Sequence, residues 1–279
     1  MTEKVHTSTQ RPRNEQNKTS AKLTIDGLNL SYNSEKTIFK NVSVSIKKGE
    51  FVSIIGPSGC GKSSLLNVIA GFVQPTSGHV YVNETKVRKP GPDRAVVFQD
   101  LALFPWLNVI ENVAFGLKIQ GVNKKERMER SLEAIQLVGL TGHEQTSISD
   151  LSGGMRQRVA IARTIVTNPE ILLMDEPFSA LDAQTRENMQ DELLAIQRKT
   201  GMTIILVTHS IDEAVYLSDR VIVMQNGGGE LLDIIDVNLP RPRNLEVRLT
   251  QAFNEYKRKL ILNLKQGYAY KGEQFGSGI

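Results

Sequence analysis

The stretch that decides the fold reads Gly56-Pro57-Ser58-Gly59-Cys60-Gly61-Lys62-Ser63-Ser64. It follows the apolar run Phe51–Ile55, which predicts a β-strand, and it leads into a helical pattern over Ser64–Ala70. Glycines let the backbone curl so that successive N–H groups point inward, and the start of the following helix adds positive partial charge. This succession of strand, loop and helix predicts a site that holds phosphate groups.

Composition narrows the class of protein. The chain has 279 residues, 40% apolar and 23% charged, so it can bury a large core. Its longest apolar runs are far shorter than the roughly 18 residues that a membrane span needs, so any membrane function should come through a partner chain. The net charge of +4 is spread out and aromatics are only 6%, which argues against nucleic-acid binding. Cys60 is the single cysteine, which excludes an internal disulfide and fits a reducing compartment.

The pattern of apolar residues changes along the chain. Alternation over 23–30 and 39–46 predicts antiparallel strands near the N-terminus. Beyond Asp150, helices and buried strands alternate, which predicts a mainly parallel sheet covered by helices, with ligands at the carboxyl ends of its strands. The expected strands are 171–174, 203–207 and 221–224, and the expected helices are 154–166, 183–199 and one capped by Ser210 with Glu213.

Two further helical regions are expected. Asn108 with Glu111 forms a capping-box start, and 124–138 should be a helix with Met128, Leu132, Ile135 and Val138 on one face. Gly227-Gly228-Gly229 predicts a turn, and 239–243 a rigid connector. Apolar residues from Leu245 to Leu264 recur at helical spacing, so this segment packs on its own domain or, alternatively, forms a partner surface. We therefore expect a disordered polar tail at 1–20, one main domain at 21–238 with a helical subdomain at about 100–165, and a short C-terminal extension at 239–279.

Four polar residues are suited to nucleotide chemistry. Lys62 should reach the β and γ phosphates, and the hydroxyl of Ser63 should bind Mg²⁺. Asp175 ends the run 171–174, so its carboxylate should stand at the edge of a central strand and fix a water on Mg²⁺. Glu176 follows at once and is suited to orient or deprotonate the attacking water. These residues predict a chain that binds ATP with Mg²⁺ and hydrolyses it.

Further motifs, in order along the chain, resemble those of the nucleotide-binding subunits of ABC transporters. After the phosphate loop they are Phe98-Gln99 (Q-loop), 151–158 (signature), 179–182 (D-loop) and Thr208-His209 (switch histidine). The resemblance runs from about Leu23 to Met224, with small departures at Ser64, Met155 and Ser210. It implies an α/β fold, a P-loop NTPase ABC cassette with a mainly parallel central sheet, an N-terminal antiparallel β subdomain and a helical subdomain carrying the signature.

The resemblance also implies roles at the matched positions. Gln99 would ligate Mg²⁺ or position water, and His209 would contact the γ-phosphate. Tyr32 would stack on adenine, a surface tyrosine being the alternative. Other nucleotide contacts are expected from Gly56, Pro57, Ser58, Gly59, Cys60, Gly61, Lys62, Ser63, Ser64, Ser152, Gly153, Gly154 and Asp182. Because Ser152 opens a helix, its N–H groups would hold the γ-phosphate bound by a second, identical or paralogous, ATP-binding subunit paired head to tail.

Membrane partners follow from the same resemblance. Leu103-Phe104-Pro105-Trp106 is an apolar group where a membrane permease subunit would dock, although Trp106 could instead be a core residue. The segments 91–94 and 239–243 resemble ATPases that drive nitrate, sulfonate and taurine uptake, so we expect a peripheral subunit at the cytoplasmic face, serving a solute-binding protein indirectly. The rival is a soluble single-cassette ABC ATPase acting in assembly. A regulator that binds ATP without hydrolysis is disfavoured by Asp175, Glu176 and His209.

Overall fold

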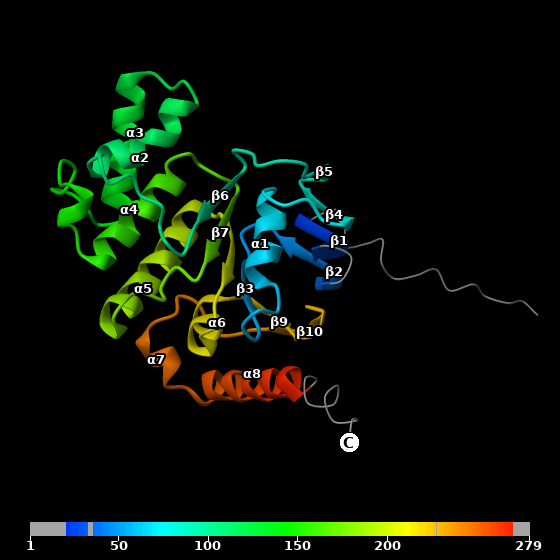
Figure 1. Cartoon of the computed structure of the whole chain (residues 1–279). Coiled ribbons are helices and arrows are strands. Elements are labelled where there is room, and N and C mark those ends of the chain that lie inside the picture. Colours follow the sequence, from blue (N-terminus) through cyan, green and yellow to red (C-terminus); the bar gives the residue numbers. More distant parts are fainter. Residues whose placement is uncertain (1–20, 33–35, 227, 270–279) are drawn as a thin grey trace, which may run out of the picture.

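The computed structural model describes residues 21–32, 36–226 and 228–269, and the predicted polar tail lies outside them. The chain forms two sheets with helices packed around them, which confirms the predicted α/β class (Figure 1). The N-terminal sheet is antiparallel, as predicted, with strand order β2-β1-β4-β5. Its strands are β1 (Ala21–Tyr32), β2 (Lys36–Lys47), β4 (Ser77–Val82) and β5 (Thr85–Lys86).

The central sheet has the strand order β10-β9-β3-β8-β7-β6. Its strands are β3 (Phe51–Ile55), β6 (Arg94–Val97), β7 (Ile171–Asp175), β8 (Thr203–Val207), β9 (Arg220–Met224) and β10 (Leu231–Asp236). Neighbouring strands from β9 through β6 are parallel, and only the edge strand β10 pairs antiparallel. The sheet is therefore mainly parallel, as predicted, but the two edge strands β6 and β10 were not foreseen.

Helices lie on both sides of this sheet. They are α1 (Lys62–Ala70), α2 (Val109–Ile119), α3 (Lys124–Leu137), η2 (Ile148–Asp150), α4 (Gly153–Ile165), α5 (Ala183–Thr200), α6 (Ile211–Leu217), α7 (Leu245–Arg248) and α8 (Gln251–Ala269). In Figure 1, α2, α3 and α4 gather at one end of the molecule, away from the antiparallel sheet at the other end. The predicted capping box at Asn108 and Glu111 is present at the start of α2.

The core has two parts, one on each face of the central sheet. Alternate residues of β3 point to opposite faces: Phe51 and Ile55 join the apolar cluster that extends into α2, α3 and α4, whereas Val52 and Ile54 join the cluster under α1 and the antiparallel sheet. All five residues of β3 are buried, because both faces are covered. The strand that precedes the phosphate loop is therefore held from both sides.

Two details differ from the sequence predictions. Of the stripe predicted for α3, Ile135 and Val138 are buried and Met128 packs against the core, but Leu132 is 45% exposed and Ser131 is buried beside it. The single C-terminal helix expected from Leu245 is broken into α7 and α8, and Leu245 and Leu249 are exposed at the break. A new helix starts after the break because the Thr250 hydroxyl accepts a hydrogen bond from the N–H of Phe253 and so caps α8.

The helix α8 packs on the chain's own core, the first of the two expected alternatives. Phe253 and Leu260 are almost fully buried in the same cluster as Phe51, and α8 contacts α6 and β9. The predicted connector also contributes, because Arg243 is buried and its guanidinium donates to the carbonyls of Val215, Tyr216, Ser218 and Val237. These bonds tie the segment before α7 to the end of α6.

Candidate functional site

Four predicted motifs meet at one edge of the central sheet. Because β3, β8, β7 and β6 are neighbouring parallel strands, their carboxyl ends share that edge. The chain leaves these strands at the motifs, which are, in spatial order, the phosphate loop after β3, Thr208-His209 after β8, Asp175-Glu176 at the end of β7, and Phe98-Gln99 after β6. The structure thus brings together residues separated by more than half of the domain's sequence.

The phosphate loop curls back over the start of α1. Gly59 and Gly61 adopt positive φ angles of 80° and 99°, which a side chain would disfavour. The ammonium of Lys62 lies inside the loop and donates to the carbonyls of Gly56 (2.9 Å) and Pro57 (3.0 Å). Cys60 is buried, and burial raises the pKa of its thiol, so this residue offers only its backbone to a ligand.

Ser63 and Asp175 form the oxygen-rich part of the site. The hydroxyl of Ser63 donates to Oδ1 of Asp175 at 3.1 Å, across 112 positions of sequence. Burial is the largest influence on Asp175 and raises its pKa; Glu176 raises it further, while Ser63 and Lys62 oppose the shift. A hydroxyl and a carboxylate oxygen at the mouth of a phosphate loop fit Mg²⁺, which takes few protein ligands when phosphates supply the rest. The described residues hold no cluster of three or more His, Cys, Asp or Glu suited to a metal.

Glu176 and His209 face each other beside this pair. Nδ1 of His209 lies 3.1 Å from Oε2 of Glu176, and the side chains are 65% and 24% exposed, respectively. Glu176 has a φ of 46°, a conformation that costs a non-glycine residue about 1–3 kcal/mol. Its N–H donates to Val207, and its carbonyl accepts from the N–H and hydroxyl of Ser179. These bonds hold the backbone in place and aim the carboxylate at His209.

Two charged residues that the sequence did not single out for this site support the histidine. Thr208 donates its hydroxyl to the buried carboxylate of Glu213 at 2.5 Å, and the N–H of Ser210 donates to Thr208. Arg186 approaches Glu213 at 4.0 Å and donates to the carbonyls of Phe178 and Leu181. The sequence signal for Glu213 was its capping position in α6, which does not reveal that its carboxylate turns back to the histidine loop.

The signature residues lie at the start of α4. Ser152 caps this helix by accepting from the N–H of Met155, and Gly153 is exposed while Gly154 is buried. A Cβ on Gly154 would lie 2.6 Å from Cγ2 of Thr185, so α4 and α5 approach closely only because residue 154 is glycine. Asp182 caps α5 by accepting from the N–H of Thr185, and this backbone bond lowers the pKa of its carboxyl. The side-chain bonds of Ser152 and Asp182 therefore stabilise helix starts within the chain.

Gln99 and Tyr32 are both surface residues. Gln99 is exposed just beyond β6, where Phe98 stacks on Phe72 with ring centroids 5.9 Å apart. Tyr32 ends β1 and is 49% exposed. Neither side chain is fixed in the core, so both are accessible to a ligand at the surface.

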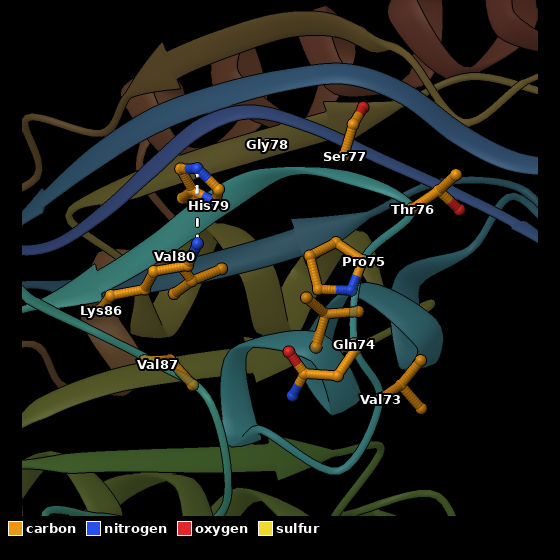
Figure 2. A pocket seen from close by; sticks show the side chains of 11 residues that line it. Val73, Gln74, Pro75, Thr76, Ser77, Gly78, His79, Val80, Lys86 and Val87 are labelled. Atoms are coloured by element: carbon orange, nitrogen blue, oxygen red, sulfur yellow. Dashed lines mark hydrogen bonds between the residues drawn. The ribbon is translucent and has the colours of Figure 1, made fainter.

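Hollows also lie away from the sheet edge. A groove of about 470 Å³ runs between α2 and α3; Ala114, Phe115 and Met128 line it, and Trp106 stands 76% exposed at its mouth. A smaller cavity of about 160 Å³ lies beside β4, where Nε2 of His79 is 3.4 Å from Nζ of Lys86, and none of the predicted site residues lines it (Figure 2). Across the part of the chain that the structure describes, no helix is both long and apolar enough to span a bilayer.

Known proteins match this chain in sequence. A family model described as "ABC transporter" matches residues 39–179. An uncharacterized ABC transporter ATP-binding protein of Methanocaldococcus jannaschii is 50% identical over 225 residues, covering 81% of this chain and 83% of the relative. The taurine import ATP-binding protein TauB of Burkholderia pseudomallei is 50% identical over 215 residues, covering 76% and 83%. The bicarbonate transport ATP-binding protein CmpC of Synechococcus elongatus is 46% identical over 241 residues, covering 85% of this chain but 36% of CmpC.

Solved structures match the fold. The Clostridium perfringens protein cbiO1, described as part of an ABC transporter complex, has a TM-score of 0.74 at 27% identity, covering 90% of this chain and 99% of that one. A dimeric ATP-binding cassette described as bound to ADP and phosphate in a post-hydrolysis state has a TM-score of 0.69 at 34% identity, covering 77% and 99%. With the phosphate loop, Asp175 and Glu176 at one sheet edge, these matches show that the chain belongs to the ABC transporter family as an ATP-binding cassette, and that it is an ATPase.

Proposed function

We propose that the chain is the ATP-hydrolysing subunit of an ABC importer, with the nucleotide bound at the carboxyl edge of the central sheet. The observation that carries this proposal is the adjacency of two pairs, Ser63 with Asp175 and Glu176 with His209, each 3.1 Å apart. Ser63 lies in the first turn of α1, while Asp175 ends β7 and is followed directly by Glu176. The first pair would hold Mg²⁺ together with Gln99. When bound, Mg²⁺ would neutralise charge on the phosphates.

The protein residues around the phosphates would act in three ways. The N–H groups of residues 56–64 and the ammonium of Lys62 would bind the β and γ phosphates, with Lys62 exchanging its present carbonyl partners for phosphate oxygens. Glu176 would accept a proton from the water that attacks the γ-phosphate. His209 would orient Glu176 through Nδ1 and contact the γ-phosphate with the rest of its ring. Tyr32 would stack on adenine.

A second ATP-binding subunit would complete each site. Ser152 and Gly153 are exposed at the N-terminus of α4, where N–H groups and the helix dipole favour an anion. We propose that they, with Gly154 and Asp182, face the γ-phosphate held by the partner cassette. The dimeric form of the related cassette supports pairing of this kind.

The groove between α2 and α3 would receive a membrane permease subunit. A 76% exposed tryptophan beside an apolar hollow is typical of a protein contact, because large aromatic side chains dominate binding energy at interfaces. Lys118, Lys124 and Arg127 line the same groove, which would suit a segment with acidic residues. The description of cbiO1 as part of a transporter complex supports this arrangement over a soluble assembly factor.

The transported solute would be a small anion such as nitrate, a sulfonate or taurine, imported through the separate permease. The relatives named for taurine import and bicarbonate transport support a solute with an anionic oxygen group. The solute-binding protein would deliver it on the far side of the membrane, and the present chain would work at the cytoplasmic face.

Purification from detergent-solubilised membranes, combined with uptake assays, tests this function. We expect the tagged chain to bring down multi-span permease subunits, and a strain lacking the gene to lose uptake of labelled taurine, nitrate or bicarbonate. Trp106→Ala should lose the permease, whereas Leu249→Ala, which removes a 78% exposed leucine elsewhere, should retain it. Recovery with soluble assembly proteins alone, and unchanged uptake in the deletion strain, would contradict import.

A further inference from the structure

The segment between β6 and α2 contains two consecutive strained residues. Leu101 and Ala102 have φ angles of 59° and 44°, a left-handed conformation that disfavours any residue with a Cβ. The turn is tight, because the N–H of Leu101 donates to Phe98 and that of Ala102 to Asp100. Such strain persists only where surrounding contacts over-determine the backbone.

The contact that holds this turn is a single arginine of α4. Arg163 donates through one nitrogen to the carbonyl of Ala102 and through another to that of Leu101, both at 2.6 Å. The planar guanidinium fork presents two N–H donors in a fixed geometry that suits two adjacent carbonyls, whereas the ammonium of lysine is a single point charge on a flexible stem. Burial lowers the pKa of Arg163, with Asp100 opposing the shift, so the guanidinium is placed here at a desolvation cost.

Arg163 also contacts the aromatic group at the permease groove. Its guanidinium carbon lies 5.5 Å from the ring centroid of Phe104. That ring lies 4.4 Å from Phe115 and 5.6 Å from Trp106, centroid to centroid. The backbone of Phe104 is fixed to α2 by the buried amide of Asn112, which accepts from its N–H and donates to its carbonyl. One side chain of the signature helix therefore touches both the turn after Gln99 and the aromatic group of the groove.

We propose that Arg163 is a positioning residue that holds Leu101 and Ala102 left-handed and thereby fixes Gln99 at the nucleotide edge. The proposal rests on the proposed role of Gln99 beside Mg²⁺ and the γ-phosphate. Without the two carbonyl bonds, the turn relaxes toward the ordinary right-handed region, and the backbone two residues earlier moves with it. Arg163 thus acts through the Gln99 loop and does not touch the nucleotide.

Glycine substitutions that relieve the backbone strain at residues 101 and 102 test this proposal. Arg163→Met in the full chain should lower kcat for ATP hydrolysis about 5- to 30-fold, the range expected when a strained turn loses its support, and should raise the Mg²⁺ concentration that gives half-maximal activity. Arg163→Lys should behave similarly. Adding Leu101→Gly and Ala102→Gly to the Met variant should restore part of the loss, because glycine has no Cβ to disfavour the left-handed turn. The same glycines in the parent should change kcat little.

Two control variants separate this positioning role from a general loss of stability and from a failure of the Gln99 assignment. Arg130→Met removes an arginine that donates to the carbonyl of Val166 in the same helical region, and it should leave kcat and Mg²⁺ dependence unchanged. If Arg163→Met lowers the thermal midpoint alone, or if the glycines restore no activity, the positioning role is wrong. Gln99→Ala tests the proposed role of Gln99. If this variant keeps the parent kcat and Mg²⁺ dependence, the role of Gln99 is wrong. If Gln99→Ala lowers kcat while Arg163→Met has the parent kcat, only the Arg163 proposal is wrong.

Discussion

Nδ1 of His209 lies 3.1 Å from Oε2 of Glu176, at the ends of two neighbouring parallel strands. The strained backbone of Glu176 holds its carboxylate toward the histidine, while the buried Glu213 holds Thr208. The pair has the geometry of a base with an orienting partner. In the proposed function, its place beside Ser63 and Asp175 would put proton transfer and phosphate binding within one small region.

Glu176→Gln should remove the base and leave the nucleotide contacts in place. We expect the steady-state rate of phosphate release to fall about 10²- to 10⁴-fold, with ATP binding retained. Phosphate release and equilibrium binding of a fluorescent ATP analogue measure the two quantities. Glu255→Gln, on the exposed face of α8, is the matched control for loss of a carboxylate. Turnover at the parent rate in the Glu176 variant would show that another group accepts the proton.

Lys62→Ala should weaken binding of the nucleotide itself. A charged hydrogen bond contributes about 1.5–3 kcal/mol, so the Kd for ATP should rise roughly 10- to 100-fold. Isothermal titration with ATP and with AMP tests this, because AMP lacks the β and γ phosphates and should bind the variant and the parent alike. An unchanged ATP affinity would exclude Lys62 from the phosphate contacts.

The neighbouring glycines of the signature should respond differently to alanine. In Gly154→Ala the new Cβ would meet Thr185 at 2.6 Å, so the chain itself should lose about 1–3 kcal/mol of stability. In Gly153→Ala the nearest atom is Cδ2 of Leu181 at 3.8 Å, an ordinary contact, so folding should be unaffected. An ATPase loss in Gly153→Ala with an unchanged thermal midpoint would therefore report a contact made by the partner cassette. Full activity of this variant would argue against Gly153 at the paired site.

The C-terminal helix should be part of the folding unit. Leu260 is fully buried in the central cluster, so Leu260→Ala should lower the free energy of unfolding by about 2–5 kcal/mol. Leu262, on the same helix, is 51% exposed, and Leu262→Ala should change it by no more than about 0.5 kcal/mol. Urea titration followed by circular dichroism measures both. Equal effects would mean that α8 frays from the cassette in solution.

Glu213 should give stability a dependence on pH. Burial raises the pKa of its carboxyl above the ordinary value of 4.5, although Thr208 and Arg186 oppose the shift. The stabilising contribution of the protonated form is present below that value and is lost as pH rises through the raised pKa. Glu213→Gln, which keeps an acceptor for Thr208, should therefore gain thermal midpoint relative to the parent as pH rises from 4.5 to 8. Glu133→Gln on the exposed surface of α3 should show no such trend, and a parallel response of the two variants would refute the assignment.

The sequence anticipated the elements whose signals are local. The glycine-rich loop after a mostly apolar run identified the phosphate loop, and the caps at Asn108 and Ser210 identified helix starts, because these signals depend on residues a few positions apart. The edge strands β6 and β10 were not predicted because β6 has only four residues and begins with an arginine, and the apolar residues of β10 do not alternate with polar ones. Leu132 was wrongly predicted to be buried. Its helical spacing places it near the apolar face of α3, but the spacing does not show how much of that face the neighbouring helices cover.

The sequence by itself determined that a glycine-rich loop after a buried strand, a strand-end carboxylate and a histidine just beyond another buried strand occur in one α/β chain. Only the tertiary structure decided which of them meet. Strand order in a parallel sheet depends on long-range packing of apolar faces, and it set Ser63 against Asp175 and His209 against Glu176. It also decided that Arg163 supports the turn after Gln99, because a guanidinium finds two carbonyls 61 and 62 positions away only once α4 has packed against that turn.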